Sequence, residues 1–368
     1  MPMLAELLDA VVGVDTHRDT HEVEIALPTG TPLATCSISN DSGGYAELID
    51  WIAQHTPGPR LLIAIEGTRS YGVGLARAAI AAGLVVIECA QPARGARRGK
   101  GKSDPIDAHL AVLTALRLDA NRLPIPRADG DREALRILIS ARDELTTVNT
   151  AQTNRLRALL LAGDDTDRQL ARARLTAAVL AGLIRRRLPR DADRVQAIRQ
   201  VEIRRLALAL RDAAQALRAN RTQLAGIVED LAPGLTARPG IGPVSAAQVI
   251  VSFSHPGRCR DDAAFAALGG ISPLQASSGR TVRHRLNRGG DRALNKAIHV
   301  IATTRMRDCP TTRAYVARRT AQGKRPQEIR RCLKRYIARQ LHRTLTNTMT
   351  TAAHHQPLEG HPRPLDNT

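Results

Sequence analysis

The chain contains the stretch Val11-Val12-Gly13-Val14-Asp15, an apolar run that ends in a carboxylate. A second stretch, Leu61-Leu62-Ile63-Ala64-Ile65-Glu66, repeats this pattern further along the chain. Short apolar runs bounded by turn residues are typical of buried strands. We therefore expect Asp15 and Glu66 to lie where two central strands end.

A second pair of carboxylates lies in the stretch Ser103-Asp104-Pro105-Ile106-Asp107. Ser103 is a favourable N-cap, so a helix is expected to start here, with Asp104 and Asp107 on one face of its first turn. Carboxylates gathered at strand ends and a helix start can hold two hard divalent cations, which clamp the attacking and leaving oxygens of a phosphodiester. Each acid alone is equally explained as a solvated strand end or a complement of the helix dipole. The ordered set in a strongly basic chain favours the metal site.

Residues 1–127 predict an α/β unit. Strands are expected at 11–15, 23–27, 33–39, 61–66 and 84–87, and helices at 44–54 and 73–82. Strands in sequence followed by strand–helix alternation indicate a mixed sheet with covering helices, in which the second strand runs antiparallel to the first. A Gly- and Arg-rich linker, 91–102, leads to Asp104 and is expected to bind phosphate. Its candidate nucleic-acid-binding residues are Arg97, Arg98, Lys100 and Lys102.

Residues 128–232 predict helices throughout, because they are rich in Ala, Leu and Arg and contain few helix breakers. One part has a heptad seam with alternating spacings of three and four. The seam consists of Leu210, Ala213, Leu217, Asn220, Leu224, Ile227 and Leu231. Such a stripe packs helix against helix, and a polar Asn within it can fix register and partner number. A coiled coil between chains and a seam within one chain are equally compatible with this pattern.

Residues 233–350 predict a third domain, followed by a flexible tail at 351–368. The domain opens with Pro239-Gly240-Ile241-Gly242-Pro243, which resembles a helix-hairpin-helix. The backbone N–H groups of Gly240 and Gly242 could bind a phosphate without reading sequence. A plain turn between helices is the alternative explanation.

Basic charge is concentrated near the C-terminal end of the chain. The net charge is +19, yet residues 1–127 carry 12 basic and 14 acidic side chains. Residues 280–343 carry 19 basic and 3 acidic side chains. Uniform compositional bias would not leave the first third slightly acidic. The segment therefore predicts a polyanionic partner, bound through its phosphates.

Composition excludes several other classes of protein. Aromatic residues make up 2% of the chain, so stacking of bases on aromatic side chains is not expected to dominate recognition. The five cysteines are scattered and form no CxxC pair, which argues against a structural zinc or a disulfide framework and suits a reducing cytoplasm. Neither a signal peptide nor a membrane span is expected, and the predicted location is cytoplasmic.

A second candidate centre lies in the polar stretch Ser277-Ser278-Gly279, which basic residues follow closely. These candidate nucleic-acid-binding residues are Arg280, Arg283, Arg285 and Arg288. A serine attacks phosphate when its pKa is lowered or when the charged transition state is stabilised, and arginines supply the second effect. An ordinary polar turn would have the same local sequence.

The motifs occur in an order that resembles a family of insertion-sequence transposases. That family pairs a DEDD RuvC-like N-terminal domain with a C-terminal serine transposase domain and includes the bridge-RNA-guided recombinases. The matching pieces are Gly13-Val14-Asp15, Ile65-Glu66, Lys102-Ser103-Asp104 through Asp107-Ala108, Pro239-Gly240-Ile241-Gly242, Gly270-Ile271-Ser272-Pro273 to Ser278-Gly279, and Arg288-Gly289. The chain departs from the family's pattern at Asn295-Lys296, where a Leu-Arg pair is more usual.

The resemblance implies a function for each of these groups. Asp15, Glu66, Asp104 and Asp107 would bind Mg²⁺, in a two-metal site, and Ser278 would form a covalent bond to DNA, with Ser277 the less favoured choice. The implied partners are DNA, a guide (bridge) RNA, and further copies of the chain in a dimer or tetramer, with no membrane. The implied fold is an α/β RuvC-like (RNase H-type) domain, a helical coiled-coil middle, and a mainly α C-terminal domain with a helix-hairpin-helix.

The chain is accordingly predicted to be a DNA transposase or recombinase, a phosphoryl-transfer enzyme. Two alternatives remain open on the residues alone. One is a Holliday-junction-type resolving nuclease that uses only the four acids. The other is a non-catalytic nucleic-acid-binding protein in which the basic charge is used and the acids are not.

Overall fold

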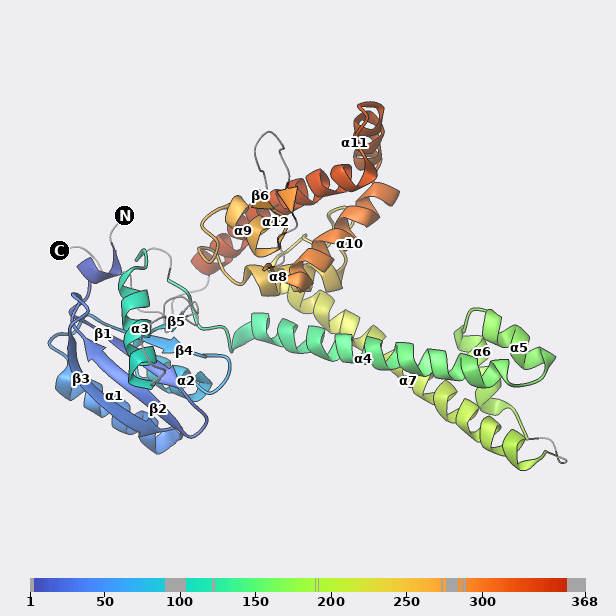
Figure 1. Ribbon diagram of the computed structural model, residues 1–368, viewed down its shortest axis with the longest axis horizontal. Helices are drawn as coiled ribbons and strands as arrows, with labels where there is room; N and C mark the ends of the chain where they lie inside the picture. The colour runs from blue at the N-terminus through green and yellow to red at the C-terminus, as the bar shows by residue number, and fades with distance from the viewer. Residues whose placement is uncertain are drawn as a thin grey trace. The chain divides into compact units, whose positions relative to one another are not determined.

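The computed structural model describes residues 3–89, 104–120, 123–188, 190, 192–272, 274–275, 284–285, 287 and 289–355. The chain divides into two compact units (Figure 1). One consists of Met1–Glu133 together with Val249–Thr368, and the other of Ala134–Gln248. These units do not test the segment boundaries predicted from the sequence, because a compact unit can combine two domains.

The N-terminal part of the first unit contains a five-stranded mixed sheet, as the sequence predicts. Its strands are β1 (Ala10–Thr16), β2 (Thr20–Ala26), β3 (Pro32–Ser39), β4 (Leu61–Glu66) and β5 (Val85–Cys89), in the order β3-β2-β1-β4-β5. The hairpin partners β1, β2 and β3 are antiparallel, whereas β4 runs parallel to both β1 and β5. The buried apolar run of β1 therefore lies at the centre of the sheet, as expected of a strand covered on both faces.

Helices cover both faces of this sheet, as Figure 1 shows. One face packs on α1 (Ser42–His55) and α2 (Val73–Ala81), and the other packs on α3 (Asp104–Leu116). Side chains alternate between the faces along each strand. Val12 and Val14 of β1 face α1 and α2, while Val11 belongs to the core under α3. The short 3-10 helix η1 (Leu4–Glu6) adds Leu4 to that second core.

Gly13 allows α3 to lie directly on β1. A Cβ at this position would be 2.3 Å from the carbonyl oxygen of Ala108 and 2.7 Å from Cγ2 of Val112. Any side chain at residue 13 would therefore push the helix away from the strand. This close approach fixes the height of the first turn of α3 above the end of β1.

The second unit is helical. It contains most of α4 (Gly130–Leu161), then α5 (Asp165–Arg172), α6 (Ala177–Arg185) and α7 (Arg194–Leu231), and the beginning of α8 (Pro243–Phe253). Its core includes Leu156 and Leu160 of α4, Leu183 of α6, and Leu206 of α7. Helix α7 begins with a capping box, in which the Asp193 side chain and the Gln196 backbone and side chain satisfy each other.

Asn220 of the predicted heptad seam contacts α4 of the same chain. Its Nδ2 donates to the carbonyl oxygen of Leu138 at 2.8 Å, and Nη1 of Arg142 donates to its Oδ1 at 3.3 Å. The same Arg142 Nη1 donates to the carbonyl oxygen of Leu217 at 3.1 Å. Of the two explanations for the seam, the structure supports packing within one chain at this residue.

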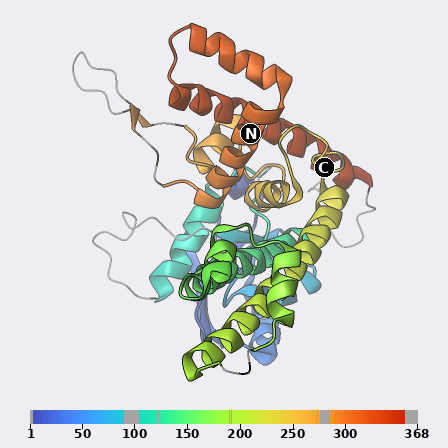
Figure 2. The same cartoon turned by 90° about the vertical axis from the view of Figure 1, so that its right-hand side faces the viewer.

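The C-terminal part of the first unit is mainly helical. Its elements are α9 (Asp262–Leu268), the strands β6 (Leu274–Gln275) and β7 (His284–Arg285), α10 (Arg292–Asp308), α11 (Pro310–Ala321) and α12 (Pro326–His355). Helix α12 packs against α9 and α10, and α10 contacts α11, which Figure 2 shows from a second direction. Within the described ranges, no helix has an apolar stretch that could cross a bilayer.

Candidate active site and nucleic-acid interface

The strands place three acidic residues in one row across the sheet. Asp15 pairs with Glu22 of β2. On its other side, the parallel register that joins Val14 to Ile65 continues to Glu66. Directly paired residues on neighbouring strands point to the same face of a sheet. This is the face under α3, because Val11 and Leu62, each four residues earlier on its strand, both lie in the α3 core.

Cys89 continues this row and supports the direction of Glu66. It pairs with Glu66 across β4 and β5, and its thiol lies 3.8 Å from the carbonyl oxygen of Ala111 in α3. Burial raises the pKa of the Cys89 thiol to about 12, and the negative charges of Glu66 and Glu88 act in the same direction. The Glu66 charge therefore raises the pKa of a thiol that faces α3, which agrees with Glu66 facing α3 as well.

Helix α3 brings the second pair of acids to the same place. Asp107 is buried, and so are Ala111 and Ala115, which follow it at helical spacing on the side that packs on the sheet. Asp104 is the first residue of the helix, three positions before Asp107, although its side chain lies outside the described residues. Residues three apart share a helix face. The backbone thus places the Asp104 position over the same sheet end.

The described acids of this centre are buried although they are charged residue types. Asp15, Glu66 and Asp107 are 6%, 7% and 6% exposed. Nε2 of His17 lies 3.2 Å from Oδ2 of Asp15. The hydroxyl of Thr16 donates to the carbonyl oxygen of Glu66 at 2.8 Å and ties together the ends of the two strands. Carboxylates are rarely buried unless they are paired or coordinate a metal.

The chemistry of these side chains suits a hard divalent cation, because every donor is a carboxylate oxygen. Among the side chains that the structure describes, no three acidic, histidine or cysteine groups are yet arranged to hold a metal ion. Asp104 is outside that set. The donor types therefore fit magnesium.

The sequence reading missed Glu22 and Glu24. Both lie on β2 and face α3, and Oε1 of Glu24 is 2.6 Å from Nδ1 of His109. Their signal was present in the alternation of Glu22 and Glu24 with the apolar Val23 and Ile25. Once β2 is paired antiparallel with β1 through a short turn, that alternation predicts an acid beside Asp15.

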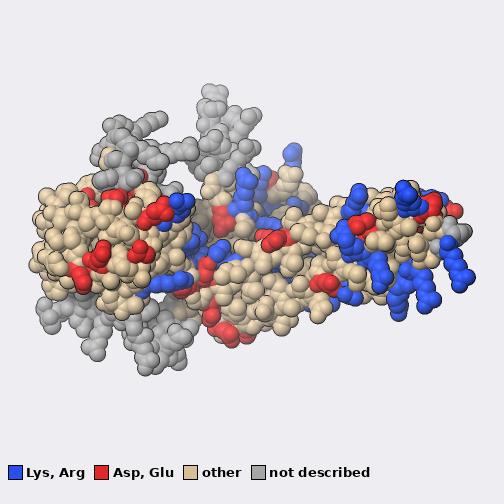
Figure 3. All heavy atoms as spheres, turned by 90° about the horizontal axis from the view of Figure 1, so that it is seen from below, with Lys and Arg blue, Asp and Glu red and all other residues tan. Residues whose placement is uncertain are grey.

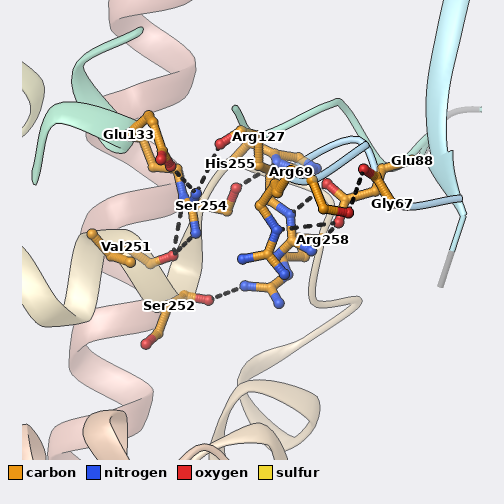
Figure 4. A network of polar contacts seen from close by, with 12 residues as sticks. Gly67, Arg69, Glu88, Arg127, Glu133, Val251, Ser252, Ser254, His255 and Arg258 are labelled. Atoms are coloured by element: carbon orange, nitrogen blue, oxygen red, sulfur yellow. Dashed lines mark hydrogen bonds and ion pairs between the residues drawn. The ribbon is translucent and has the colours of Figure 1, made fainter. Parts of the chain in front are cut away.

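A network of polar contacts lies between the ends of β4 and β5 and the end of α8 (Figure 4). Glu88 of β5 accepts from Nε of Arg127 at 2.8 Å, and Arg69, in the loop after Glu66, lies 3.7 Å away. Burial raises the pKa of Glu88, but hydrogen bonds and charge from Arg127 outweigh it, so the pKa is lowered overall. Arg69 thereby links the loop that follows Glu66 to the ion pair of Glu88 with Arg127.

Two arginines in this network bind the last carbonyl groups of α8. Arg132 donates to the Val251 carbonyl oxygen at 3.2 and 3.3 Å, and Arg258 donates to that of Ser252. These carbonyls have no partner within the helix, and the negative end of the helix dipole favours cations. Burial, with neighbouring arginines, lowers the pKa of Arg132 to about 10. The helix ends at Phe253, and the next residue, Ser254, has a φ of 69° in the left-handed region.

Most predicted nucleic-acid contacts lie outside the described residues. Those are Arg97, Arg98, Lys100, Lys102, Arg280, Arg283 and Arg288, together with Ser277 and Ser278, while Arg285 is described only as part of β7. In the predicted hairpin, Gly240 has a φ of 76°, which a glycine adopts without strain. The N–H of Gly242 donates to Oγ of Ser245 at 3.1 Å, so it is already engaged.

The second unit carries basic charge that the sequence analysis did not single out. Figure 3 shows Lys and Arg side chains gathered at its end, over α5, α6 and the start of α7. The exposed arginines there include Arg168, Arg172, Arg174, Arg185, Arg187, Arg190 and Arg194. Acidic residues nearby in the sequence keep the local net charge modest, so charge counts along the chain do not reveal these arginines.

Two models of transposase families match the chain, one in its N-terminal half and one in its C-terminal half. Residues 12–162 match the model of the DEDD transposase domain of IS110 elements, described as a transposase, and residues 233–317 match the transposase of the IS116/IS110/IS902 family. The first match contains Asp15, Glu66, Asp104 and Asp107, and the second contains Ser278. The chain belongs to the IS110 family of transposases.

Relatives of this IS110-family chain include proteins of Streptomyces coelicolor and Mycobacterium paratuberculosis. A mini-circle protein of Streptomyces coelicolor, named as a putative transposase for IS117, is 28% identical, with 93% of this chain and 95% of the relative covered. The 43.6 kDa protein of insertion element IS110 from the same organism is 24% identical over 85% of this chain and 88% of its own. A 42 kDa protein of IS900 from Mycobacterium paratuberculosis is 25% identical, with 85% and 90% covered.

Proposed function

We propose that this IS110-family chain catalyses metal-dependent cleavage and exchange of DNA strands during movement of an insertion element. The observation that carries the proposal is the burial of Asp15, Glu66 and Asp107 together on the α3 side of one sheet end. Negative charges gathered in a buried place repel one another, and a bound cation relieves that repulsion. A structural core has no need of such an arrangement, whereas a centre for phosphodiester chemistry does.

Asp15, Glu66, Asp104 and Asp107 would hold two magnesium ions. Bound magnesium supplies charge neutralisation at the attacking and leaving oxygens of the phosphodiester. The chain's own contribution is to fix the carboxylates: Gly13 sets the distance between β1 and α3, and the Thr16 hydroxyl ties β1 to the end of β4. His17, at 3.2 Å from Asp15, orients that carboxylate.

Ser278 is the proposed nucleophile. Its Oγ would attack a DNA phosphorus, form a serine–phosphate ester and release the strand's sugar hydroxyl. The ester keeps the energy of the broken bond, so a second strand's hydroxyl can displace the serine and restore a phosphodiester without an external energy source. The position of Ser278 within the second family match supports the assignment, with Ser277 as the less favoured choice.

A denaturing gel with end-labelled DNA carrying the joined ends of the element tests this mechanism. The wild-type chain should give a shifted band that protease removes, Ser278→Ala should give none, and Ser277→Ala should retain it. A band from Ser278→Ala would disprove the nucleophile. If the wild type cuts DNA without forming the band, a resolving nuclease that uses only the acids is the better description. DNA binding without cutting would support a non-catalytic protein.

Two further partners belong to the proposal. A guide RNA is proposed from the family resemblance, and sequencing RNA that copurifies with the chain tests it.

Self-association is proposed from the beginning of α7, where Val195, Ile198 and Val201 are all highly exposed at spacings of three. Large apolar side chains grouped on one helix face are typical of an interaction surface. Val195→Glu with Val201→Glu should therefore reduce the oligomer observed by sedimentation.

A further inference from the structure

A pocket of about 500 Å³ lies at the N-terminal half of α10. One wall is backbone at Gly269, Gly270 and Gly290, and the other is formed by side chains of α10. The glycines are needed for this shape, since a Cβ on Gly290 would be 2.4 Å from the nitrogen of Gly270. Exposed backbone without side chains lets a bulky ligand approach closely.

The pocket lies where the chain leaves and re-enters the helical domain around β6 and β7. The N–H of Asp291 donates to the carbonyl oxygen of Leu268 at 2.6 Å and closes this excursion at its base. Strands β6 and β7 pair antiparallel just beyond, with Leu274 opposite Arg285. Residues 276–283, which include both candidate serines, connect these two strands in the sequence. The pocket is therefore built from the segments immediately flanking the serine stretch.

Three residues with basic side chains line the α10 wall of the pocket: Arg292, Lys296 and His299. Their spacings of four and three put them on one helix face. The acid of the pocket, Asp291, is occupied elsewhere. Its Oδ1 accepts from the N–H groups of Ala293 and Leu294, and its Oδ2 accepts from the Ser252 hydroxyl at 2.7 Å. The Asp291 carboxylate is thus held by these three donors, which leaves Arg292 and Lys296 as the side chains of the lining that can bind an anion.

A second layer of positive charge lies behind this wall. Nζ of Lys334 donates to Oδ1 of Asn295 at 2.6 Å, and Nδ2 of Asn295 donates to the Gly269 carbonyl oxygen at 2.6 Å. Asn295 thereby links the α12 ammonium to the glycine wall. Burial lowers the pKa of His299, and the charges of Lys334 and Arg330 lower it further. The contributions of Lys334 and Arg330, which add to that of burial, are those of positive charge near the pocket, which favours an anion.

We propose that this pocket binds a backbone phosphate of the DNA strand that the serine attacks, with Arg292 and Lys296 as its ligands. The inference rests on the proposed function, which supplies the DNA and the serine. Paired cations, a carboxylate held away and bare backbone are the features of a phosphate site. None of these features reads a base, so the pocket sets the register of the strand and carries no sequence preference.

The test is a scan of single uncharged phosphates. Duplexes carrying the joined element ends are made with one methylphosphonate at each successive position around the junction, and their dissociation constants are measured by fluorescence anisotropy. We expect the wild type to lose about tenfold affinity at one position, as for a charge-assisted contact worth roughly 1.4 kcal/mol. The variant Arg292→Gln with Lys296→Gln should bind more weakly overall and lose less than about twofold at that position.

Arg307→Gln is the matched control. Arg307 lies on the same helix and is exposed, and Asp308 already pairs with it, at 2.8 Å. This variant should keep the wild-type position dependence. The proposal is overturned if the double variant keeps the full loss of affinity at that position, or if the wild type shows no sensitive position. Failure of the proposed function gives a different result. If the wild type shows the sensitive position but forms no serine–DNA band, the phosphate site is supported and Ser278 is not the nucleophile.

Discussion

At the scale of single residues, Gly13 has the most direct influence on the acidic centre. It lies under α3, where a Cβ would be 2.3 Å from the Ala108 carbonyl oxygen, part of the helix backbone. A backbone atom cannot move aside as the end of a flexible side chain can. The separation between the strand that carries Asp15 and the helix that carries Asp107 is therefore set by the absence of one methyl group.

Gly13→Ala should destabilise the first unit by roughly 1–3 kcal/mol, because overpacking forces the strand and helix apart. It should also reduce strand exchange more than its fraction of unfolded protein explains. Urea unfolding followed by circular dichroism, together with an exchange assay, measures both. Gly43→Ala is the control, since its nearest neighbour is a side-chain oxygen of Asp41 at 3.3 Å. A Gly13→Ala chain as stable and active as the control would contradict this packing.

His255 gives the first unit a dependence on pH. Burial lowers its pKa to about 4, and the charges of Arg258 and Arg127 contribute. The unfolded chain has an ordinary histidine pKa near 6.5 and takes up a proton first as pH falls. Stability is therefore complete above about pH 6.5 and is lost as pH falls toward 4, by roughly 2–3 kcal/mol.

The measurement compares the free energy of unfolding at about pH 7 and about pH 5 for the wild type and His255→Gln. The variant should lose less stability over this interval, because its side chain does not titrate. Glu88, whose pKa is lowered, and every other titratable side chain are common to both chains, so they affect both chains alike. An equal loss in both chains would show that His255 is not buried in its neutral form.

At the scale of elements, the sheet could be predicted because its signals are local. Apolar runs, alternation and turn residues lie within each strand, and the observed bounds of β1 and β4 follow the runs that end at Asp15 and Glu66. Pairing is less local. The position of Glu22 beside Asp15 depends on the register of a hairpin, which no single strand reveals.

The heptad seam predicted a packing surface but not the helix that packs on it. Its spacing predicts that α7 packs against another helix, yet it does not identify that helix. The hydrogen bonds of Asn220 with Leu138 and Arg142 identify α4 of the same chain. A periodic stripe describes one surface alone, so the choice between a partner within the chain and one outside it depends on the complementary surface.

Asn220→Ala should destabilise the second unit by about 1 kcal/mol, because the hydrogen bonds from Asn220 to the Leu138 carbonyl oxygen and from Arg142 to Asn220 would be lost, while Arg142 keeps the Leu217 carbonyl oxygen. Self-association should be unaffected, since Asn220 bonds within the chain. Urea unfolding and sedimentation velocity of the same sample separate the two effects. A change in oligomeric state with unchanged stability would instead place Asn220 at an interface between chains.

At the scale of the whole molecule, basic side chains are distributed unevenly along the chain. Residues 280–343 carry 19 basic and 3 acidic side chains, and exposed arginines also cover the end of the second unit in Figure 3. Composition located the first group because its net charge is large. It missed the second, since nearby acids mask it in any sum over sequence and only the fold shows which side chains reach the surface.

Neutralising Arg283, Arg285 and Arg288 together should lower the slope of log affinity against log salt by roughly 0.9 for each phosphate that the chain no longer neutralises. Neutralising Arg185, Arg187 and Arg190 provides the comparison and should change the slope less. Binding titrations over a range of salt concentrations give both slopes. A larger change in the second variant would move the main polyanion-binding surface to the end of the second unit.

The central claim is that the acids at the sheet end form the centre that cleaves and exchanges DNA strands. Asp15→Asn tests it most directly, because Asp15 lies in the row with Glu66, is buried, and keeps its shape in the variant. Asp19→Asn is the control, since Asp19 is exposed in the turn after β1 and pairs with Arg18 at 2.9 Å. Both are assayed for strand exchange at saturating magnesium, with folding and DNA binding measured alongside. The account predicts a loss of about a hundredfold or more for Asp15→Asn alone, with binding retained. Undiminished exchange by Asp15→Asn would contradict it.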